Sequence, residues 1–170
     1  MNETIQNIKK RRSIRKFTND PVAPKDIQTL LECAMAAPTA RNQQAFRFVV
    51  IDDPKILNQV AQNIEHAKMC HSANKAIVVC SEVVNEMQEL YWIHDSAAAT
   101  QNILLAATSL GIGSVWVAIH PRQQKVEFMK ALLNLPTGIE PLSLVALGVG
   151  DEQKPPNERY DSKKVHYNGW

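Results

Sequence analysis

Apolar residues recur three and four positions apart along much of the chain, and this spacing places them on one face of an α-helix. Other residues mark where such helices begin. Asp53 suits the N-cap and Pro54 the first helical position, so a helix begins there. The pattern predicts helices over residues 3–10, residues 25–37, a segment beginning at Asp53, residues 90–110, and a segment following His120 and Pro121.

Short runs of aromatic and β-branched residues lie between these helices and are typical of strands. They occupy residues 46–51, 76–80, 114–119 and 142–149. The order along the chain is therefore two helices, then strand and helix three times over, then a last strand. This order predicts an α+β protein built from mixed α/β layers, whereas the order and direction of the strands in the sheet stay open.

The segment 90–110 is apolar on almost every side, and residues 96–119 carry no formal charge. We reject a membrane span because polar residues such as Thr100, Gln101 and Asn102 interrupt the run. A helix that is apolar all round needs cover on all sides. We therefore expect this helix at the centre of the protein or in the interface of a dimer.

The length of 170 residues predicts a single domain over residues 1–170. Hydrophobic residues make up 45% and charged residues 21%, which is ordinary for a soluble globular protein. The N-terminus lacks the apolar region of a secretory signal. Cys33, Cys70 and Cys80 do not make a disulfide framework, so a reducing, cytoplasmic location is the simplest interpretation.

Positive charge is concentrated near the N-terminus, although the formal net charge of the chain is only +2. Six of the eight residues from Lys9 to Lys16 are basic, and Ser13 lies among them. Guanidinium groups and a hydroxyl suit a phosphate, so the run predicts a small phosphate-bearing ligand. A solvated basic face and a nucleic-acid patch are the alternatives, and the near-neutral balance argues against the second.

A second polar segment, residues 37–44, follows a predicted helix and precedes a predicted strand. It gathers side-chain amides, a hydroxyl and the guanidinium of Arg41 in one loop. Such groups suit the ring edge of a heteroaromatic ligand, where hydrogen-bond donors and acceptors alternate. A polar surface turn is the plainer alternative.

Three other patterns are weaker. His66 and Cys70 are four residues apart, as in some zinc sites, but no second ligand pair follows at a matching spacing. The consecutive residues His94, Asp95 and Ser96 suggest a catalytic triad. Such a triad is defined by geometry and not by adjacency in the sequence, and no GxSxG nucleophile motif is present. The glycines at 111 and 113 lack the third glycine of a dinucleotide fingerprint and open a strand instead of a helix.

The two polar segments also carry a family resemblance, which later blocks of the chain continue. Each block is weak alone, but the ordered set spans nearly the whole chain and is specific. The chain resembles the FMN-dependent nitroreductase family at residues 11–17, 37–50, 95–107, 110–116, 155–160 and 165–168.

The resemblance implies which residues hold the FMN phosphate. Arg11, Ser13 and Arg15 match the family's phosphate and ribityl contacts, and Arg12 lies beside them. Arg159, near the other end of the chain, matches a second basic phosphate contact. Lys9, Lys10 and Lys16 are then ordinary solvated charges.

The resemblance also implies which residues surround the flavin ring. Lys68 matches a cation near the flavin N1/O2 edge, where it would stabilise the negative charge of the reduced ring. Main-chain N–H groups, not side chains, are expected to face the reactive N5 edge. The implied ring contacts are Pro38, Thr39 and Asn42 from the partner subunit, and Lys68, Val117 and Ala118.

The implied protein is a homodimeric FMN-dependent oxidoreductase with a nitroreductase-like fold: a mostly antiparallel sheet flanked by helices, with the C-terminal arm exchanged between subunits. NADH or NADPH would deliver hydride to flavin N5, and a nitroaromatic, quinone or activated alkene would then be reduced in the same pocket by ping-pong kinetics. No catalytic side chain, metal, membrane or nucleic acid is implied.

Three alternatives stay open: a flavin carrier or sensor without turnover, a specialised reaction such as reductive dehalogenation, and a nucleotide- or RNA-binding module. The loop also departs from the family's Asn-x-Gln-Pro-Trp pattern at Ala45 and Phe46, and Arg41 stands where a small residue is common. We expect these changes to affect the choice of substrate and not phosphate binding.

Overall fold

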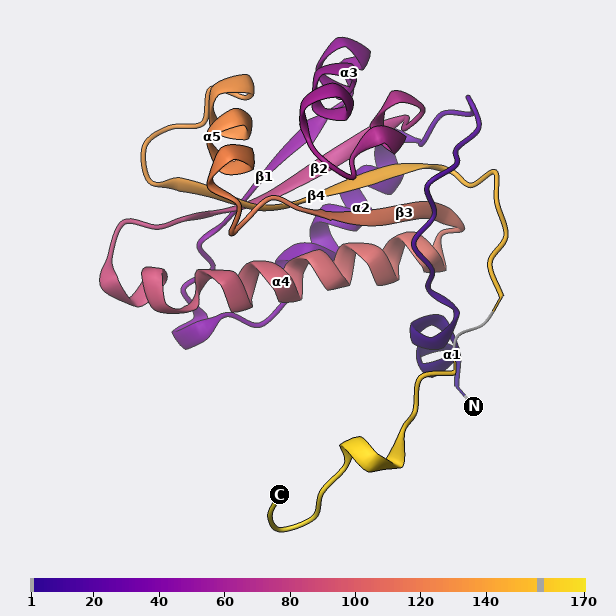
Figure 1. Ribbon diagram of the computed structural model, residues 1–170, viewed down its shortest axis with the longest axis vertical. Helices are drawn as coiled ribbons and strands as arrows, with labels where there is room; N and C mark the ends of the chain where they lie inside the picture. Colours follow the sequence, from indigo (N-terminus) through magenta and orange to yellow (C-terminus); the bar gives the residue numbers. More distant parts are fainter. Residues whose placement is uncertain (1, 156–157) are drawn as a thin grey trace.

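A computed structural model describes residues 2–155 and 158–170. Its centre is a 4-stranded sheet in the order β1-β2-β4-β3, and every neighbouring pair is antiparallel (Figure 1). The strands are β1 (Phe46–Ile51), β2 (Lys75–Glu82), β3 (Ile112–Ala118) and β4 (Ile139–Val149). The mostly antiparallel sheet expected from the family resemblance is thus confirmed, and β3 lies at an edge.

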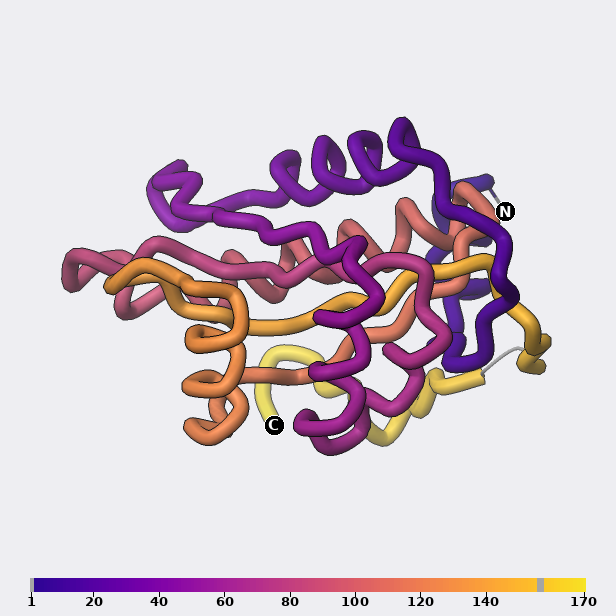
Figure 2. Tube along the Cα trace, turned by 90° about the horizontal axis from the view of Figure 1, so that it is seen from above, coloured from indigo at the N-terminus to yellow at the C-terminus, as the bar shows by residue number. Residues whose placement is uncertain are grey.

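Helices cover both faces of this sheet, so that the described part of the chain forms three layers (Figures 1 and 2). One outer layer holds α3 (Pro54–Asn63), α5 (Gln123–Leu132) and the short 3₁₀ turn η2 (Lys68–His71). The other holds α2 (Pro24–Met35) and α4 (Glu86–Ser109). The helix α1 (Glu3–Lys10) packs against α4. The sequence predicted these elements in this order, and Asp53 caps α3 as expected by accepting from the Lys55 N–H.

Each sheet face carries its own hydrophobic core. Period-two alternation explains this, because successive side chains of a strand point to opposite faces. Val115 and Val117 of β3 pack in the core beneath α3 and α5, whereas Trp116 packs against the core beneath α2 and α4. The central strands β2 and β4 are buried on both sides, which is why they read as nearly continuous apolar runs.

The longest helix, α4, starts at Glu86, four residues before the predicted start. Its N-cap is Asn85, whose side chain accepts a hydrogen bond from the Gln88 N–H. It lies against the sheet on one side only. Its buried face includes Ser96 and Thr100, whose hydroxyls pair with Ser81 and Ser143 of the sheet at 2.9 Å each. The other side exposes several large apolar residues, so the described chain does not surround the helix. Exposed large apolar side chains at the start of α4 are Leu90, Tyr91 and Ile93.

The chain between α1 and α2 runs along the end of the sheet. The Ile14 N–H donates to the Ser114 carbonyl at 2.9 Å, and the Thr18 N–H donates to the Val149 carbonyl at 2.9 Å. Gly113 permits this approach, because a Cβ there would lie 3.0 Å from the Ile14 side chain. The basic run is thereby fixed beside the first half of the β3 edge.

The C-terminal segment leaves the body of the fold past α1 and ends away from the sheet (Figure 1). It contains only one short 3₁₀ turn, η3 (Ser162–Lys164), among its described residues. Tyr160, Tyr167 and Trp170 are 84%, 85% and 104% exposed. Pro156 and Asn157, part of the tail block in the family resemblance, lie outside the described residues. Within the described residues, no helix combines the length and the apolarity that a membrane crossing requires.

Candidate functional site

The basic run and the C-terminal tail meet in one strongly cationic pocket of about 360 Å³. Burial, followed by the charges of Arg159 and then Arg12, lowers the pKa of the Arg11 guanidinium below its usual value. Cations that repel one another inside a pocket favour an anion that neutralises them. The residues that line this pocket are Arg11, Arg12, Ser13, Arg15, Lys154, Pro155 and Arg159.

Arg12 holds the pocket together through main-chain contacts. Its Nε donates to the Pro155 carbonyl at 2.8 Å, and its guanidinium also donates to the carbonyls of Lys9 and Arg11 at 2.9 and 2.6 Å. These bonds tie the N-terminal run to the tail. They occupy most of the hydrogen-bond donors of the Arg12 guanidinium. In this structure Arg12 therefore has a structural role.

Lys154 lines the same pocket and Glu152 supports it from behind, and the sequence analysis identified neither residue. The Lys154 ammonium donates to the Ser13 carbonyl and lies 3.2 Å from the Glu152 carboxylate. That carboxylate accepts the Arg15 main-chain N–H. This hydrogen bond is the main cause that lowers the pKa of the Glu152 carboxyl below its usual value. The sequence offers little to identify them, because their partners are main-chain atoms of Ser13 and Arg15. These atoms come close only where the C-terminal tail packs against the basic run.

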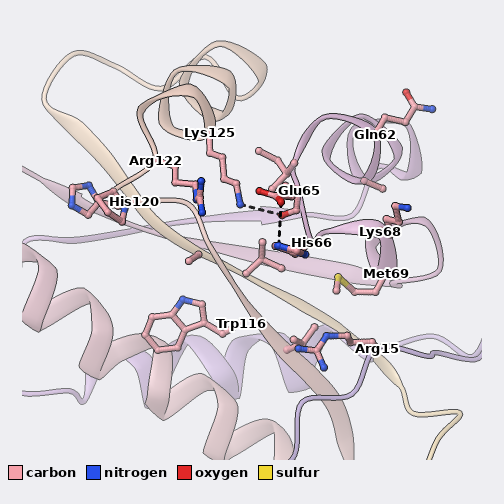
Figure 3. Close-up of a pocket in the computed structure, with 16 residues that line it drawn as sticks. Arg15, Gln62, Glu65, His66, Lys68, Met69, Trp116, His120, Arg122 and Lys125 are labelled. Carbon is pink, nitrogen blue, oxygen red and sulfur yellow. Dashed lines mark hydrogen bonds and ion pairs between the residues drawn. The ribbon is translucent and has the colours of Figure 1, made fainter.

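A larger pocket of about 1020 Å³ lies next to this one, and Arg15 lines both. Its floor is formed by residues 115–118 of β3, and its walls come from η2 with the end of α3 and from the start of α5 (Figure 3). The predicted residues Lys68, Val117 and Ala118 all line it. The structure thus places Arg15 between a phosphate-sized cationic pocket and a pocket large enough for a ring system.

The open edge of β3 presents main-chain groups to the larger pocket. Ile119 donates to Leu142 of β4 at 3.0 Å, whereas Ser114 accepts from Ile14 on the opposite side. Because main-chain groups alternate between the two sides of an antiparallel strand, Trp116 and Ala118 direct theirs away from β4. Of the two predicted main-chain positions, Ala118 therefore faces the pocket, while the N–H of Val117 faces β4 and only its side chain lines the floor.

Pro38, Thr39 and Asn42 lie elsewhere. They belong to the loop after α2, which contains the 3₁₀ turn η1 (Ala40–Asn42), and they line neither of these pockets. The loop is well held: the Ala40 N–H donates to Asp95 of α4 at 3.1 Å, and the Thr39 hydroxyl accepts from the Gln44 N–H at 3.1 Å. Within one described chain, then, these residues are separated from the pocket that holds Lys68.

The departures from the family pattern fall in two different environments. Ala45 and Phe46 are only 8% and 7% exposed, and Phe46 begins β1 and packs in the core beneath α2 and α4. Arg41 is exposed and has a φ of 50°, in the left-handed region. Ala45 and Phe46 are thus buried and Arg41 is exposed, and the effect of all three on substrate choice stays a prediction.

The weaker patterns do not assemble into sites. Cys70 is buried, while His66 is exposed and its ring lies 3.3 Å from the Glu65 carboxylate. Ser96 is fully buried against Ser81, so the run at residues 94–96 does not present a nucleophile. Over residues 2–155 and 158–170, no group of three or more His, Cys, Asp and Glu side chains is placed to share a metal ion.

The donor set suits an elongated ligand with a phosphate at one end and a planar ring at the other. Arg11, Arg15 and Arg159 offer guanidinium forks to the phosphate, and the Ser13 hydroxyl adds a further donor. The β3 edge and Lys68 then offer donors along the ring. FMN has this shape and charge, so the residues present fit it.

Comparisons with known proteins agree with this geometry. The sequence profile of the nitroreductase family matches residues 8–94 and 69–150. A protein of Archaeoglobus fulgidus, provisionally named an NADH dehydrogenase/NAD(P)H nitroreductase, is 35% identical over 100% of both chains.

Solved structures show the same fold. A crystal structure from Parabacteroides distasonis ATCC 8503, with the same provisional name, has a TM-score of 0.96 and 35% identity and covers 100% of both chains. An FMN-dependent nitroreductase from Clostridium difficile R20291 has a TM-score of 0.89 and 28% identity, covering 98% of this chain and 99% of its own.

Proposed function

The chain belongs to the nitroreductase family, and from this premise we propose that it is an FMN-dependent oxidoreductase that takes electrons from NADH or NADPH. The observation that carries the proposal is the meeting of Arg11, Ser13, Arg15 and Arg159 in one cationic pocket that continues, through Arg15, into a larger one. When bound, FMN would accept hydride from a nicotinamide and pass it to an electron-poor acceptor such as a nitroaromatic, quinone or activated alkene.

The protein's first task in this proposal is to hold the phosphate. Arg11, Arg15 and Arg159 would bind its oxygens, with Ser13 as a hydroxyl donor. Arg12 would keep the two chain segments together through its bonds to Pro155 and to the N-terminal run. Phosphate binding would compensate the Arg11 guanidinium, whose pKa is lowered first by burial and then by the charges of Arg159 and Arg12.

Its second task is to orient the ring. The main-chain groups of Ala118 and Trp116 point from the β3 edge toward the larger pocket, so they can donate to the ring without any side chain taking part. Lys68, at the opposite wall, would place a positive charge where the reduced ring becomes negative. No side chain in this scheme acts as a nucleophile or general base.

The third task falls to a second copy of the chain. Pro38, Thr39 and Asn42 do not reach the pocket within one chain, so their proposed ring contacts require the partner subunit. The exposed apolar residues of α4 and the exposed aromatics of the tail support a homodimer, because large exposed apolar patches mark interaction surfaces. In that arrangement the ring would lie between one protomer's β3 edge and the partner's loop.

Purification and anaerobic titration test the proposal directly. We expect yellow protein with about one FMN per chain, and we expect NADH or NADPH to bleach the flavin absorbance in the absence of oxygen. Protein that is colourless and cannot be reconstituted with FMN would overturn the proposal. Protein that binds FMN but is reduced by neither nicotinamide would instead be a flavin carrier or sensor, and titration with both donors would establish which one is preferred.

A further inference from the structure

The larger pocket carries more positive charge than FMN requires. Four arginine and lysine side chains line it, against a single carboxylate, that of Glu65. Arg15 adjoins the phosphate pocket, and Lys68 is assigned to the ring in the proposed function. The remaining cations, Arg122 and Lys125, come from the start of α5 and have no part in that scheme.

Glu65 does not neutralise Arg122. Its carboxylate lies 3.3 Å from the His66 ring, and its main-chain carbonyl accepts the Lys125 ammonium at 3.0 Å. Figure 3 shows that the bond from Lys125 links the start of α5 to the segment after α3. Among residues 2–155 and 158–170, no hydrogen bond or ion pair engages the Arg122 guanidinium.

Arg122 also lies away from the phosphate pocket. In Figure 3, Arg15 and Arg122 lie well apart along the larger pocket, and β3 passes between them. A phosphate held by Arg11, Arg15 and Arg159 would therefore leave the charge of Arg122 available at the far end.

We propose that Arg122 binds a negatively charged group on the substrate that enters the larger pocket, so that anionic substrates are preferred over neutral ones of similar shape. This inference rests on the proposed function. In each case the Arg122 guanidinium would bind the oxygens of an anionic group through paired hydrogen bonds. Its source is either a carboxylate on the electron acceptor or the pyrophosphate of the nicotinamide donor, and the two half-reactions separate these sources.

The oxidative half-reaction tests the acceptor. Holoenzyme is reduced with dithionite under anaerobic conditions, and its reoxidation is followed by flavin absorbance with 4-nitrobenzoate or with neutral nitrobenzene. If the acceptor supplies the anion, Arg122→Gln should lower the second-order rate constant for 4-nitrobenzoate about five- to tenfold and change that for nitrobenzene less than twofold. Added salt should reduce the wild-type preference, because an exposed guanidinium is screened.

The reductive half-reaction tests the donor. Oxidised holoenzyme is mixed with NADH or with 1-benzyl-1,4-dihydronicotinamide, which carries the same reducing ring without a phosphate. If the donor supplies the anion, Arg122→Gln should lower the rate constant for NADH about five- to tenfold and spare the neutral donor. Lys55→Gln is the matched control, because Lys55 is an exposed cation at the start of α3 that does not line the pocket.

A selective loss in either half-reaction supports the inference and names the source. Equal rate constants for wild type and Arg122→Gln with both charged substrates would overturn it. Equal losses with charged and neutral substrates would also overturn it, because they would show a structural effect of the substitution. A wild-type holoenzyme that accepts electrons from neither NADH nor the neutral donor, and passes them to neither nitro compound, would overturn the proposed function itself, and this inference with it.

Discussion

The ring of Phe17 lies directly on the main chain of Gly148. A methyl group at Gly148 would come within 2.8 Å of the Phe17 ring, closer than Cβ atoms approach other groups in folded proteins. Gly148 belongs to β4, and Phe17 directly follows the basic run, so this contact holds the end of the run against the sheet. The position of Ser13 and Arg15 in the cationic pocket thus depends on the absence of a side chain at Gly148 of β4, the strand next to β3.

We therefore expect Gly148→Ala to affect both stability and cofactor binding. The added methyl must displace Phe17, and overpacking of this kind costs about 1–3 kcal/mol of unfolding free energy. The same displacement should raise the Kd for FMN, because it moves the segment that carries Ser13 and Arg15. Urea unfolding and fluorescence titration with FMN measure the two effects. Gly169→Ala is the control, since nothing lies within 4 Å of a Cβ at Gly169, and equal results for both variants would contradict the argument.

Arg15 and Lys16 allow a direct test of the phosphate pocket. Arg15 lines it and Lys16, the next residue, does not. Arg15→Ala should weaken FMN binding by about 1.5–3 kcal/mol, the scale of a hydrogen bond to a charged group. Lys16→Ala removes the same charge from the same run and should leave the Kd nearly unchanged. Equal losses in the two variants would show that the run acts only through its overall charge, and equal affinity to wild type would place the phosphate elsewhere. Equilibrium dialysis with FMN gives the comparison.

Much of the fold could be predicted from local pattern. The strand over residues 46–51 has the predicted bounds, and Asp53 caps α3 as expected, because both signals lie within a few residues of the structure they specify. The order β1-β2-β4-β3 could not be predicted, because pairing between distant strands leaves no mark in local spacing. The buried side of α4 could not be predicted either, because hydroxyl residues such as Ser96 are buried together with large apolar ones such as Ile103, while other large apolar residues such as Leu90 are exposed.

The site divides in the same way. The family resemblance predicted that Arg159 and the basic run share a phosphate site, and the structure places Arg159 in the same pocket as Arg11. Lys154 and Glu152 escaped notice, because their partners are main-chain atoms of Ser13 and Arg15, which lie far away in the sequence. Whether these residues bind FMN stays a prediction.

Glu152 predicts a pH dependence of stability. Its carboxylate accepts the Arg15 N–H, and this bond lowers the pKa of Glu152 in the folded protein. A depressed pKa contributes stability that is present above the unfolded value of about 4.3 and is lost as the pH falls through the folded value. Glu152→Gln should thus lower the unfolding free energy by about 1 kcal/mol at pH 7, and the difference from wild type should shrink as the pH falls below about 4. Urea unfolding at several pH values measures it; a difference that grows at low pH would contradict the sign.

The cysteines predict a pattern of thiol reactivity. Burial raises the pKa of Cys70 to about 12, and burial followed by the charge of Glu140 raises that of Cys80 to about 12. Because the thiolate is the reactive form, both should resist labelling in the native protein, whereas Cys33 is partly exposed. A disulfide reagent such as DTNB should label at most one thiol quickly in native protein and all three in denaturant. Rapid native labelling that persists in Cys33→Ser would show that the buried thiols are accessible.

The C-terminal arm gives the sharpest test of the dimer. Tyr160, Tyr167 and Trp170 are almost fully exposed within one chain, and burying such aromatics against a partner would gain about 25 cal/mol per Å² of apolar area. Deleting residues 160–170 should therefore raise the dimer dissociation constant in sedimentation equilibrium. Arg159 remains in the shortened chain, so the cationic pocket keeps its lining. A loss of bound FMN on deletion would then be due to the missing partner contacts, those proposed for Pro38, Thr39 and Asn42.

The control is full-length protein with Lys163 and Lys164 changed to Ala. This variant keeps the aromatic residues of the arm and should dimerise normally. A truncated protein that dimerises as tightly as wild type would contradict the exchange of the arm between subunits.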